Sequence, residues 1–135
     1  MKTPREIVVY MMKEDSFSKW MGIQLENIDL GYCKIQLTIN SEMLNGFRIA
    51  HGGISYSLAD SALAFAANSR GFQCVSIDTS ISHIKKVSEG DVLFAVAREV
   101  HRGKTTGIYH VEVTNQNNQM VALFKGTVYI TTNKW

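Results

Sequence analysis

The sequence predicts an α+β fold in which a curved antiparallel sheet wraps one long buried helix. Three observations carry this prediction: a helical N-terminal stretch, a long alanine-rich segment in mid-chain, and strand-like alternation elsewhere. The chain has 135 residues, of which 45% are hydrophobic. This length fits one domain, residues 1–135, whose core is large enough to fold without disulfides or metal.

The N-terminal segment, residues 1–21, is expected to form two short helices. Apolar side chains recur at helical spacing on either side of a polar interruption at residues 14–16. We expect Asp15 or Ser16 to cap the second helix, because short polar side chains favour that position.

Residues 52–69 are expected to form the central helix. They contain five alanines and no proline, and Gly71 follows them as a helix-ending residue. This helix is apolar almost all round, so most of its circumference must be buried. The rest of the chain therefore has to wrap it.

Period-2 alternation of apolar and polar residues predicts the strands of that wrapping sheet. The alternation is strict between Cys33 and Ile39. Four further β-rich stretches, separated by short turns as in an antiparallel meander, follow the helix at residues 75–81, 92–96, 108–113 and 121–130. A sheet of about five to six strands around one long helix is the hotdog fold, whose uncovered face and edges favour assembly of several copies.

Composition excludes several classes of partner. The 14 basic and 12 acidic residues form no polybasic tract, so we expect neither nucleic acid nor a membrane surface as partner. No apolar run reaches the roughly 20 residues of a membrane span, and the first residues lack a signal-peptide pattern. We expect a cytoplasmic protein in which Cys33 and Cys74 are reduced core residues.

The loop before the central helix ends in Gly52 and Gly53, which place bare backbone N–H groups at a helix N-terminus. Unpaired donors and the positive end of the helix dipole stabilise an oxyanion or a polarised carbonyl there. A tight loop-to-helix turn explains the same glycine pair without any ligand, and both explanations stay open.

Asp60 lies inside the apolar helix, where aspartate has a poor propensity and an unpaired carboxylate is costly to bury. A hydrogen bond from Ser57 or Ser61 would account for it. A catalytic carboxylate, acting as nucleophile or general base at the mouth of a substrate cleft, would account for it equally well.

Spacing excludes other chemistries. His51 and Asp60 would lie roughly 13 Å apart along a helix, which excludes a Ser-His-Asp triad within this segment. The four histidines are scattered, and no metal-binding spacing or glycine-rich phosphate loop is present, so we expect no metal and no cofactor.

Two short basic groups are candidates for phosphate binding. The group His83-Ile84-Lys85-Lys86 lies at the end of one predicted strand, and the group His101-Arg102-Gly103-Lys104 lies at a predicted hairpin turn. Two or three cations with free backbone N–H groups at a turn are enough to bind a phosphate, although ordinary solvated loop residues show the same pattern.

Several motifs resemble those of the PaaI-type hotdog acyl-CoA thioesterases of phenylacetic acid degradation. The resemblance covers roughly residues 21–131, and the stretch from Asn45 to Asp60 is its most specific part. The motifs are Asn45-Gly46, His51-Gly52-Gly53, Ser57-Leu58-Ala59-Asp60, Ala67-Asn68-Ser69, the stretch from Gly103 to Tyr109 and the stretch from Val121 to Gly126.

The resemblance implies roles for four residues. Asp60 would act as nucleophile or general base towards the thioester carbonyl, and the N–H of Gly52 would polarise that carbonyl. Asn45 of a facing subunit would position the attacking water or the carboxylate, while His51 would support the loop and contact the thioester. The resemblance also implies a homodimer at minimum, and a homotetramer built as a dimer of dimers, with active sites between subunits.

The chain departs from the family pattern in two places. Phe47 stands where many relatives have histidine, and the predicted strand end Ile81-Ser82-His83-Ile84-Lys85-Lys86 lacks the arginine-proline ending of the family. Both departures concern substrate contacts rather than the chemistry. The residues expected to contact substrate are Gly53, Leu63, Thr79 and Ser80 near the acyl group and Lys85, Lys86, Arg102 and Lys104 at the CoA phosphates.

We therefore expect a metal-free enzyme that hydrolyses acyl-CoA thioesters, with phenylacetyl-CoA or a ring-hydroxylated arylacetyl-CoA as substrate. A non-catalytic acyl-CoA-binding or regulatory hotdog protein is the main alternative, and it makes no use of a buried Asp60. A hydratase for 2-enoyl thioesters is a weaker one, since it needs a different spacing of His and Asp.

Overall fold

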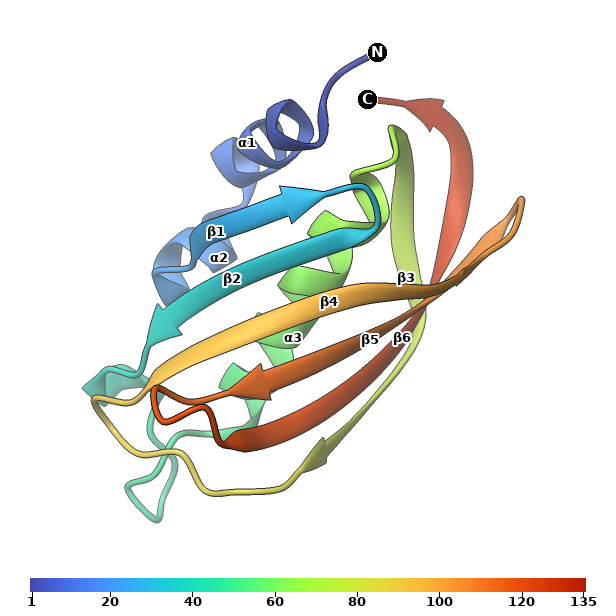
Figure 1. Cartoon of the computed structure of the whole chain (residues 1–135). Coiled ribbons are helices and arrows are strands. Elements are labelled where there is room, and N and C mark those ends of the chain that lie inside the picture. Colours follow the sequence, from blue (N-terminus) through green and yellow to red (C-terminus); the bar gives the residue numbers. More distant parts are fainter.

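The computed structural model describes residues 1–135 and is built on a six-stranded antiparallel sheet curved around one long helix, α3 (Gly52–Asn68) (Figure 1). The strands are β1 (Gln24–Asp29), β2 (Tyr32–Thr38), β3 (Phe72–His83), β4 (Val92–Arg102), β5 (Thr106–Thr114) and β6 (Met120–Lys134). Their spatial order is β1-β2-β4-β5-β6-β3. The α+β hotdog arrangement predicted from the sequence is confirmed.

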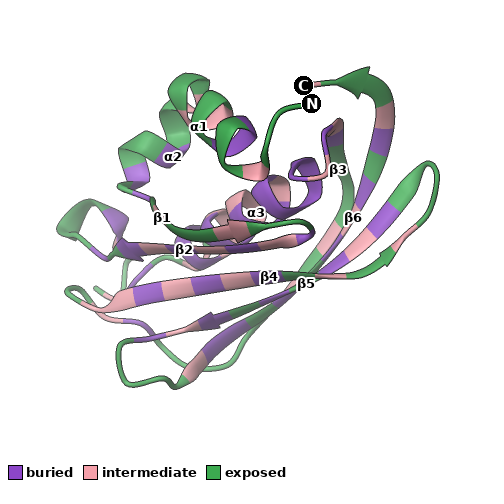
Figure 2. Cartoon of the chain, turned by 45° about the horizontal axis from the view of Figure 1, so that its top comes forward, coloured by how far each residue is buried: buried purple, intermediate pink, exposed green.

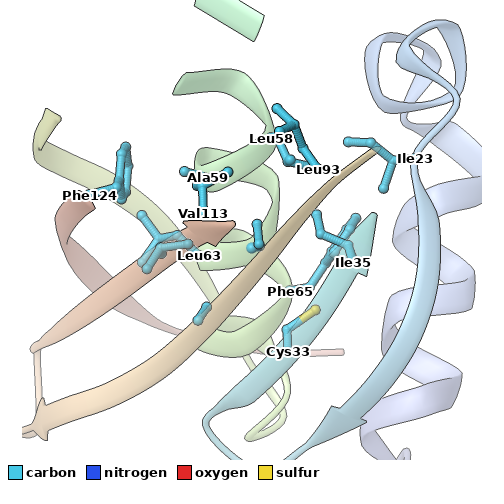
Figure 3. Packing of buried hydrophobic residues seen from close by; sticks show 14 of the residues in the cluster. Ile23, Cys33, Ile35, Leu58, Ala59, Leu63, Phe65, Leu93, Val113 and Phe124 are labelled. Carbon is cyan, nitrogen blue, oxygen red and sulfur yellow. The ribbon is translucent and has the colours of Figure 1, made fainter. Parts of the chain in front are cut away.

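The core lies between α3 and the concave face of the sheet, where buried residues of both elements meet (Figure 2). Alanines along α3 let the strands approach closely, and larger side chains from the helix fill the remaining space. Figure 3 shows Leu58, Leu63 and Phe65 of α3 facing apolar side chains of the strands. Each large apolar side chain that is fully buried stabilises the fold by about 1.5–3 kcal/mol.

Two helices precede the sheet, as predicted: α1 (Pro4–Glu14) and α2 (Ser16–Met21). Asp15 caps α2, because its carboxylate accepts the Ser18 N–H at 2.9 Å. The Ser18 hydroxyl lies 2.9 Å from the hydroxyl of Ser61 on α3, which ties the N-terminal segment to the central helix. None of the helices is both long and apolar enough to cross a membrane.

The predicted meander is correct for β4, β5 and β6 and wrong for β3, which pairs with β6 at the far edge of the sheet. Strand pairing depends on contacts far apart in the sequence, which local alternation does not encode. Strand β1 was not among the predicted stretches, because it is an exposed edge strand with a bulge between Leu25 and Asn27 that breaks its alternation.

A short 3₁₀ turn, Ser41–Met43, and the loop after it lead from β2 into α3. Cys33 and Cys74 are free and buried, in agreement with the sequence. Strand β3 has a partner on one side only, and its Val75 and Ile77 side chains are 57% and 60% exposed. An edge strand with exposed apolar side chains is a surface on which another strand can pair.

Candidate active site

Helix α3 begins with one backbone donor left open. His51 is the N-cap residue, and its Nδ1 accepts the N–H of Gly53 at 2.9 Å. The carbonyl of His51 accepts the N–H of Ile54 at 2.9 Å. Gly52 is the first helical residue and has no carbonyl one turn before it in the helix. The N–H of Gly52 is therefore the donor that a ligand at this helix start can use.

A pocket of about 260 Å³ opens beside this helix start. It brings together four residues predicted for the site, Asn45, Gly52, Lys85 and Lys86, and also His83, which belongs to the same basic group as the two lysines. The pocket thus joins the loop before α3 to the end of β3 and the segment after it.

Asn45 shapes the loop that enters α3. Its Oδ1 accepts the N–H of Phe47 at 2.9 Å and that of Ile49 at 3.4 Å. The loop turns through Arg48, which has a left-handed φ of 60°. The oxygen of the Asn45 amide holds the loop, and its NH₂ group remains without a partner in the chain at a residue that lines the pocket.

Asp60 is a half-buried carboxylate with no hydrogen-bond partner in the chain, although Ser57 and Ser61 are neighbours on the helix. The hydroxyl of Ser61 is paired with Ser18 instead. Burial raises the pKa of Asp60 above the usual value for aspartate, because nothing in the chain compensates the charge. The explanation by a serine hydrogen bond is therefore wrong, and a carboxylate available to a ligand remains.

One turn before Asp60, helix α3 packs against β3 and β6. At that position, Tyr56 of α3 hydrogen-bonds the Thr79 hydroxyl on β3. The ring of Tyr56 packs edge-on against Phe124 of β6 with centroids 5.5 Å apart. Thr79 is thus placed on the helix side of the sheet.

The other residues predicted at the acyl group lie in different environments. Leu63 is fully buried in the core (Figure 3). Its side chain packs so closely on Gly126 that a Cβ atom on Gly126 would lie 2.5 Å from Cδ2 of Leu63. Ser80 is exposed on the outer face of the sheet, beside His110 and Lys125. The structure therefore does not bring Ser80 to the face of the sheet that packs against α3, the helix of Asp60.

The two basic groups lie at opposite ends of α3. Lys85 and Lys86 share the pocket of Gly52, whereas Arg102 donates to the carbonyl of Ala67 at the other end, at 3.1 Å. The Arg102 guanidinium also lies 3.9 Å from the carboxylate of Glu99 and is engaged within the chain. Arg102 and Lys104 line a separate pocket of about 420 Å³.

The residues predicted as catalytic therefore lie in two places in one chain. Asn45, His51 and Gly52 lie at the start of α3, where Lys85 and Lys86 line the same pocket as Asn45 and Gly52, and Asp60 lies further along the helix. Gly52 and Asp60 are eight residues apart, which is about 12 Å along a helix axis. The structure brings no three metal-ligating side chains together. The sequence places His83 in a basic group with the two lysines but does not predict its contact with Gly52, since no local pattern links it to a glycine 31 positions earlier.

A curved sheet around one helix, with an open donor at the helix start and an unpaired carboxylate inside it, is the architecture of a hotdog thioesterase. Residues 47–122 match the family model of the thioesterase superfamily. The chain belongs to this superfamily.

Its relatives include the acyl-coenzyme A thioesterase PaaI of Escherichia coli, which is 40% identical over 86% of this chain and 83% of that protein. The solved structure of the E. coli PaaI protein has a TM-score of 0.95 at 35% identity and covers 97% of this chain and 95% of that chain. A Streptococcus mutans protein solved with bound acetyl-CoA has a TM-score of 0.81 at 31% identity, over 84% of this chain and 91% of that chain. The chain is thus a homologue of PaaI, and the predicted fold, family and enzyme class, a thioesterase, are confirmed.

Proposed function

We propose that this protein hydrolyses acyl-CoA thioesters to the free acid and CoA, with phenylacetyl-CoA or a ring-hydroxylated arylacetyl-CoA as substrate. The observation that carries the proposal is the half-buried, unpaired carboxylate of Asp60 on a helix that starts with the open N–H of Gly52. Similarity to a PaaI acyl-CoA thioesterase and to a structure with bound acetyl-CoA supports the choice of substrate class. The buried, free cysteines fit a reducing compartment such as the cytoplasm.

In this mechanism the N–H of Gly52 hydrogen-bonds the thioester oxygen, and the positive end of the α3 dipole stabilises the negative charge that develops there. Asp60 as general base takes a proton from water while the hydroxide adds to the carbonyl carbon. The C–S bond then breaks, and the CoA thiolate leaves and takes up the proton. Asp60 as nucleophile would instead form an acyl anhydride that water hydrolyses. In either route the Asn45 amide positions the attacking group.

Two copies of the chain are needed for a complete site in this proposal. Along one helix, Gly52 and Asp60 are about 12 Å apart, too far for both to act on one carbonyl. Two copies with antiparallel α3 helices would bring Asp60 of one to Gly52 of the other. The exposed edge of β3, with Val75 and Ile77, supports a homodimer. A homotetramer would pair two such dimers.

The CoA phosphates are proposed to lie near Lys85 and Lys86, which share the pocket of Gly52 and form no ion pair within the chain. Arg102 and Lys104 lie at the other end of α3 and would reach the same substrate only from the second copy. Because Arg102 is already bonded to Ala67 and Glu99, Lys104 is the freer of these two cations.

The variant Asp60→Asn tests the chemistry. We expect it to lower the rate of thiol release from phenylacetyl-CoA or another acyl-CoA by at least about 100-fold, the low end of what a general base contributes. The exposed carboxylate of Asp29 provides a matched control, Asp29→Asn, which should retain wild-type turnover. Wild-type turnover by Asp60→Asn would contradict the mechanism. Binding of acyl-CoA by the wild type without thiol release would instead favour the non-catalytic alternative.

The same variant tests the two-copy site. Asp60→Asn and Asn45→Ala should each be inactive alone, but a co-refolded equal mixture should regain about a quarter of wild-type activity. About half of the dimers are then mixed, and each mixed dimer holds one intact site out of two. A mixture as inactive as its components would show that each chain supplies both residues of a site by itself.

A further inference from the structure

A second histidine lies against the start of α3. His83 is the last residue of β3, and its exposed imidazole faces Gly52. A Cβ atom on Gly52 would lie 3.1 Å from both Cε1 and Nε2 of His83, so this edge of the ring is directly beside the glycine backbone. Both residues line the pocket of about 260 Å³.

The two histidines at this helix start differ in what they bind. The Nδ1 of His51 accepts the N–H of Gly53, so His51 is used in capping the helix. The imidazole of His83 forms no hydrogen bond and no ion pair with the chain. Its Nε2 is therefore an unused polar atom beside Gly52, a residue whose N–H is also unused.

We infer that His83 is a further catalytic residue, whose Nε2–H donates a hydrogen bond to the thioester oxygen together with the N–H of Gly52. This inference rests on the proposed function, since it concerns the same carbonyl group. In this proposal one oxygen atom, bound beside the Gly52 backbone, accepts a hydrogen bond from each of the two donors. No covalent bond to His83 forms, and the proton stays on the imidazole.

The surroundings of this position favour negative charge on a bound oxygen. The N-terminus of α3 contributes the positive end of its dipole, and Lys85 and Lys86 line the same pocket. No acidic side chain lines it. A donor placed before the reaction starts stabilises the developing oxyanion without reorganisation, and removal of one such donor costs about 10²–10³ in kcat.

The variants His83→Phe and His83→Gln separate hydrogen bonding from packing. Phenylalanine keeps a ring against Gly52 but has no donor, whereas glutamine carries an amide that can reach the same oxygen. We expect His83→Phe to lower kcat and kcat/KM together by about 10²-fold, the pattern of an interaction made in the transition state. His83→Gln should regain most of the activity. His110→Phe, at an exposed histidine of β5 on the outer face of the sheet, should behave as wild type.

The other possible outcomes distinguish a failure of the His83 proposal from a failure of the thioesterase proposal. Wild-type turnover by His83→Phe, a change in KM alone, or equal losses in His83→Phe and His83→Gln would overturn the role of His83 while leaving the thioesterase proposal intact. A wild-type protein that releases no thiol from any acyl-CoA would overturn both. Thermal unfolding of each variant checks that the loss of activity does not come from loss of the fold.

Discussion

The two ends of α3 carry opposite kinds of polar chemistry. At the N-terminal end, the N–H of Gly52 and the side chains of His83 and Lys85 have no hydrogen-bond partner in the chain while lining one pocket. At the C-terminal end, the side chains of Asn68, Ser69, Arg70 and Arg102 are all bonded to other parts of the fold. A helix end whose bonds are all made stabilises the protein, whereas an end whose donors are open is available to a ligand.

Asn68 is the last residue of α3. It is 1% exposed, and both the oxygen and the nitrogen of its side-chain amide are hydrogen-bonded. Its Oδ1 accepts the N–H of Cys74 at 2.8 Å and the indole N–H of Trp135 at 2.9 Å. Its NH₂ group donates to the carbonyl of Ala64 at 2.8 Å and to that of Cys74 at 3.2 Å. One side chain thus ties the helix, the start of β3 and the C-terminal tryptophan together.

Glu99 on β4 is the centre of a second group of bonds at this end. Arg70 approaches it with two bonds of 2.9 and 2.7 Å, and the hydroxyl of Tyr109 donates to it at 2.8 Å. The Arg70 hydrogen bond holds the pKa of Glu99 below its ordinary range, and the bond from Tyr109 adds to this effect. Burial, together with this hydrogen bond, raises the pKa of Tyr109. Arg102 completes the group by bonding Tyr109 and the carbonyl of Ala67.

The largest expected effect on stability comes from Glu99→Ala. Removal of one partner of a buried ion pair costs about 3–5 kcal/mol, and we expect about 3 kcal/mol in urea unfolding because Glu99 is partly exposed. The exposed pair between Glu26 and Lys34, at 3.2 Å, provides the control Glu26→Ala, which should cost less than about 1 kcal/mol. Equal losses in the two variants would contradict a stabilising role for the C-terminal end.

The stabilisation by Glu99 should depend on pH. Its pKa is lower in the folded than in the unfolded protein, so the ionised form favours folding at neutral pH. The stabilisation should be lost as the pH falls below the unfolded pKa of about 4.3 and through the folded value. The difference between wild type and Glu99→Ala should therefore shrink in acid.

Sequence reasoning succeeded where a pattern is local. The alternation of β2 and the alanines of α3 predicted those elements within one or two residues, and Asp60 was conspicuous because its neighbours are apolar. Pairing of β3 with β6 and contact of His83 with Gly52 join segments far apart in the sequence, so no local pattern predicts them.

Arg102 shows the same limit in another form. As one of several cations at a turn it resembled a phosphate ligand, and that prediction remains untested. In the fold its guanidinium donates to the carbonyl of Ala67 and lies close to the carboxylate of Glu99, so its charge is already paired within the chain. Net charge and spacing identify cations, but only the fold shows which of them are already paired.

A smaller effect is expected at the N-terminal end, from His51→Ala. The side chain caps α3 through a single bond of 2.9 Å to the N–H of Gly53. Loss of an N-cap costs about 1 kcal/mol, and His51→Asn should restore most of it because asparagine is a good N-cap residue. Chemical unfolding measures both variants, and a loss as large as that of Glu99→Ala would contradict the contrast between the two ends.

The smallest expected effect on stability is that of Asp60→Asn, and its sign is opposite to that of Glu99. Burial raises the pKa of Asp60, so the folded protein binds a proton at this carboxylate more tightly than the unfolded chain does. Protonation therefore favours folding, and wild type loses stability relative to the asparagine variant as the pH rises from the unfolded pKa of about 3.9 through the raised folded value.

Above that range, at neutral pH, Asp60→Asn should be at least as stable as wild type, and the difference should shrink towards acid pH. Urea unfolding of the two proteins between acid and neutral pH measures this difference directly. A variant that is less stable than wild type at neutral pH would mean that the ionised carboxylate stabilises the fold. A variant that gains stability while it loses turnover would mean that Asp60 lowers the free energy of unfolding but is needed for catalysis, as is common for catalytic residues.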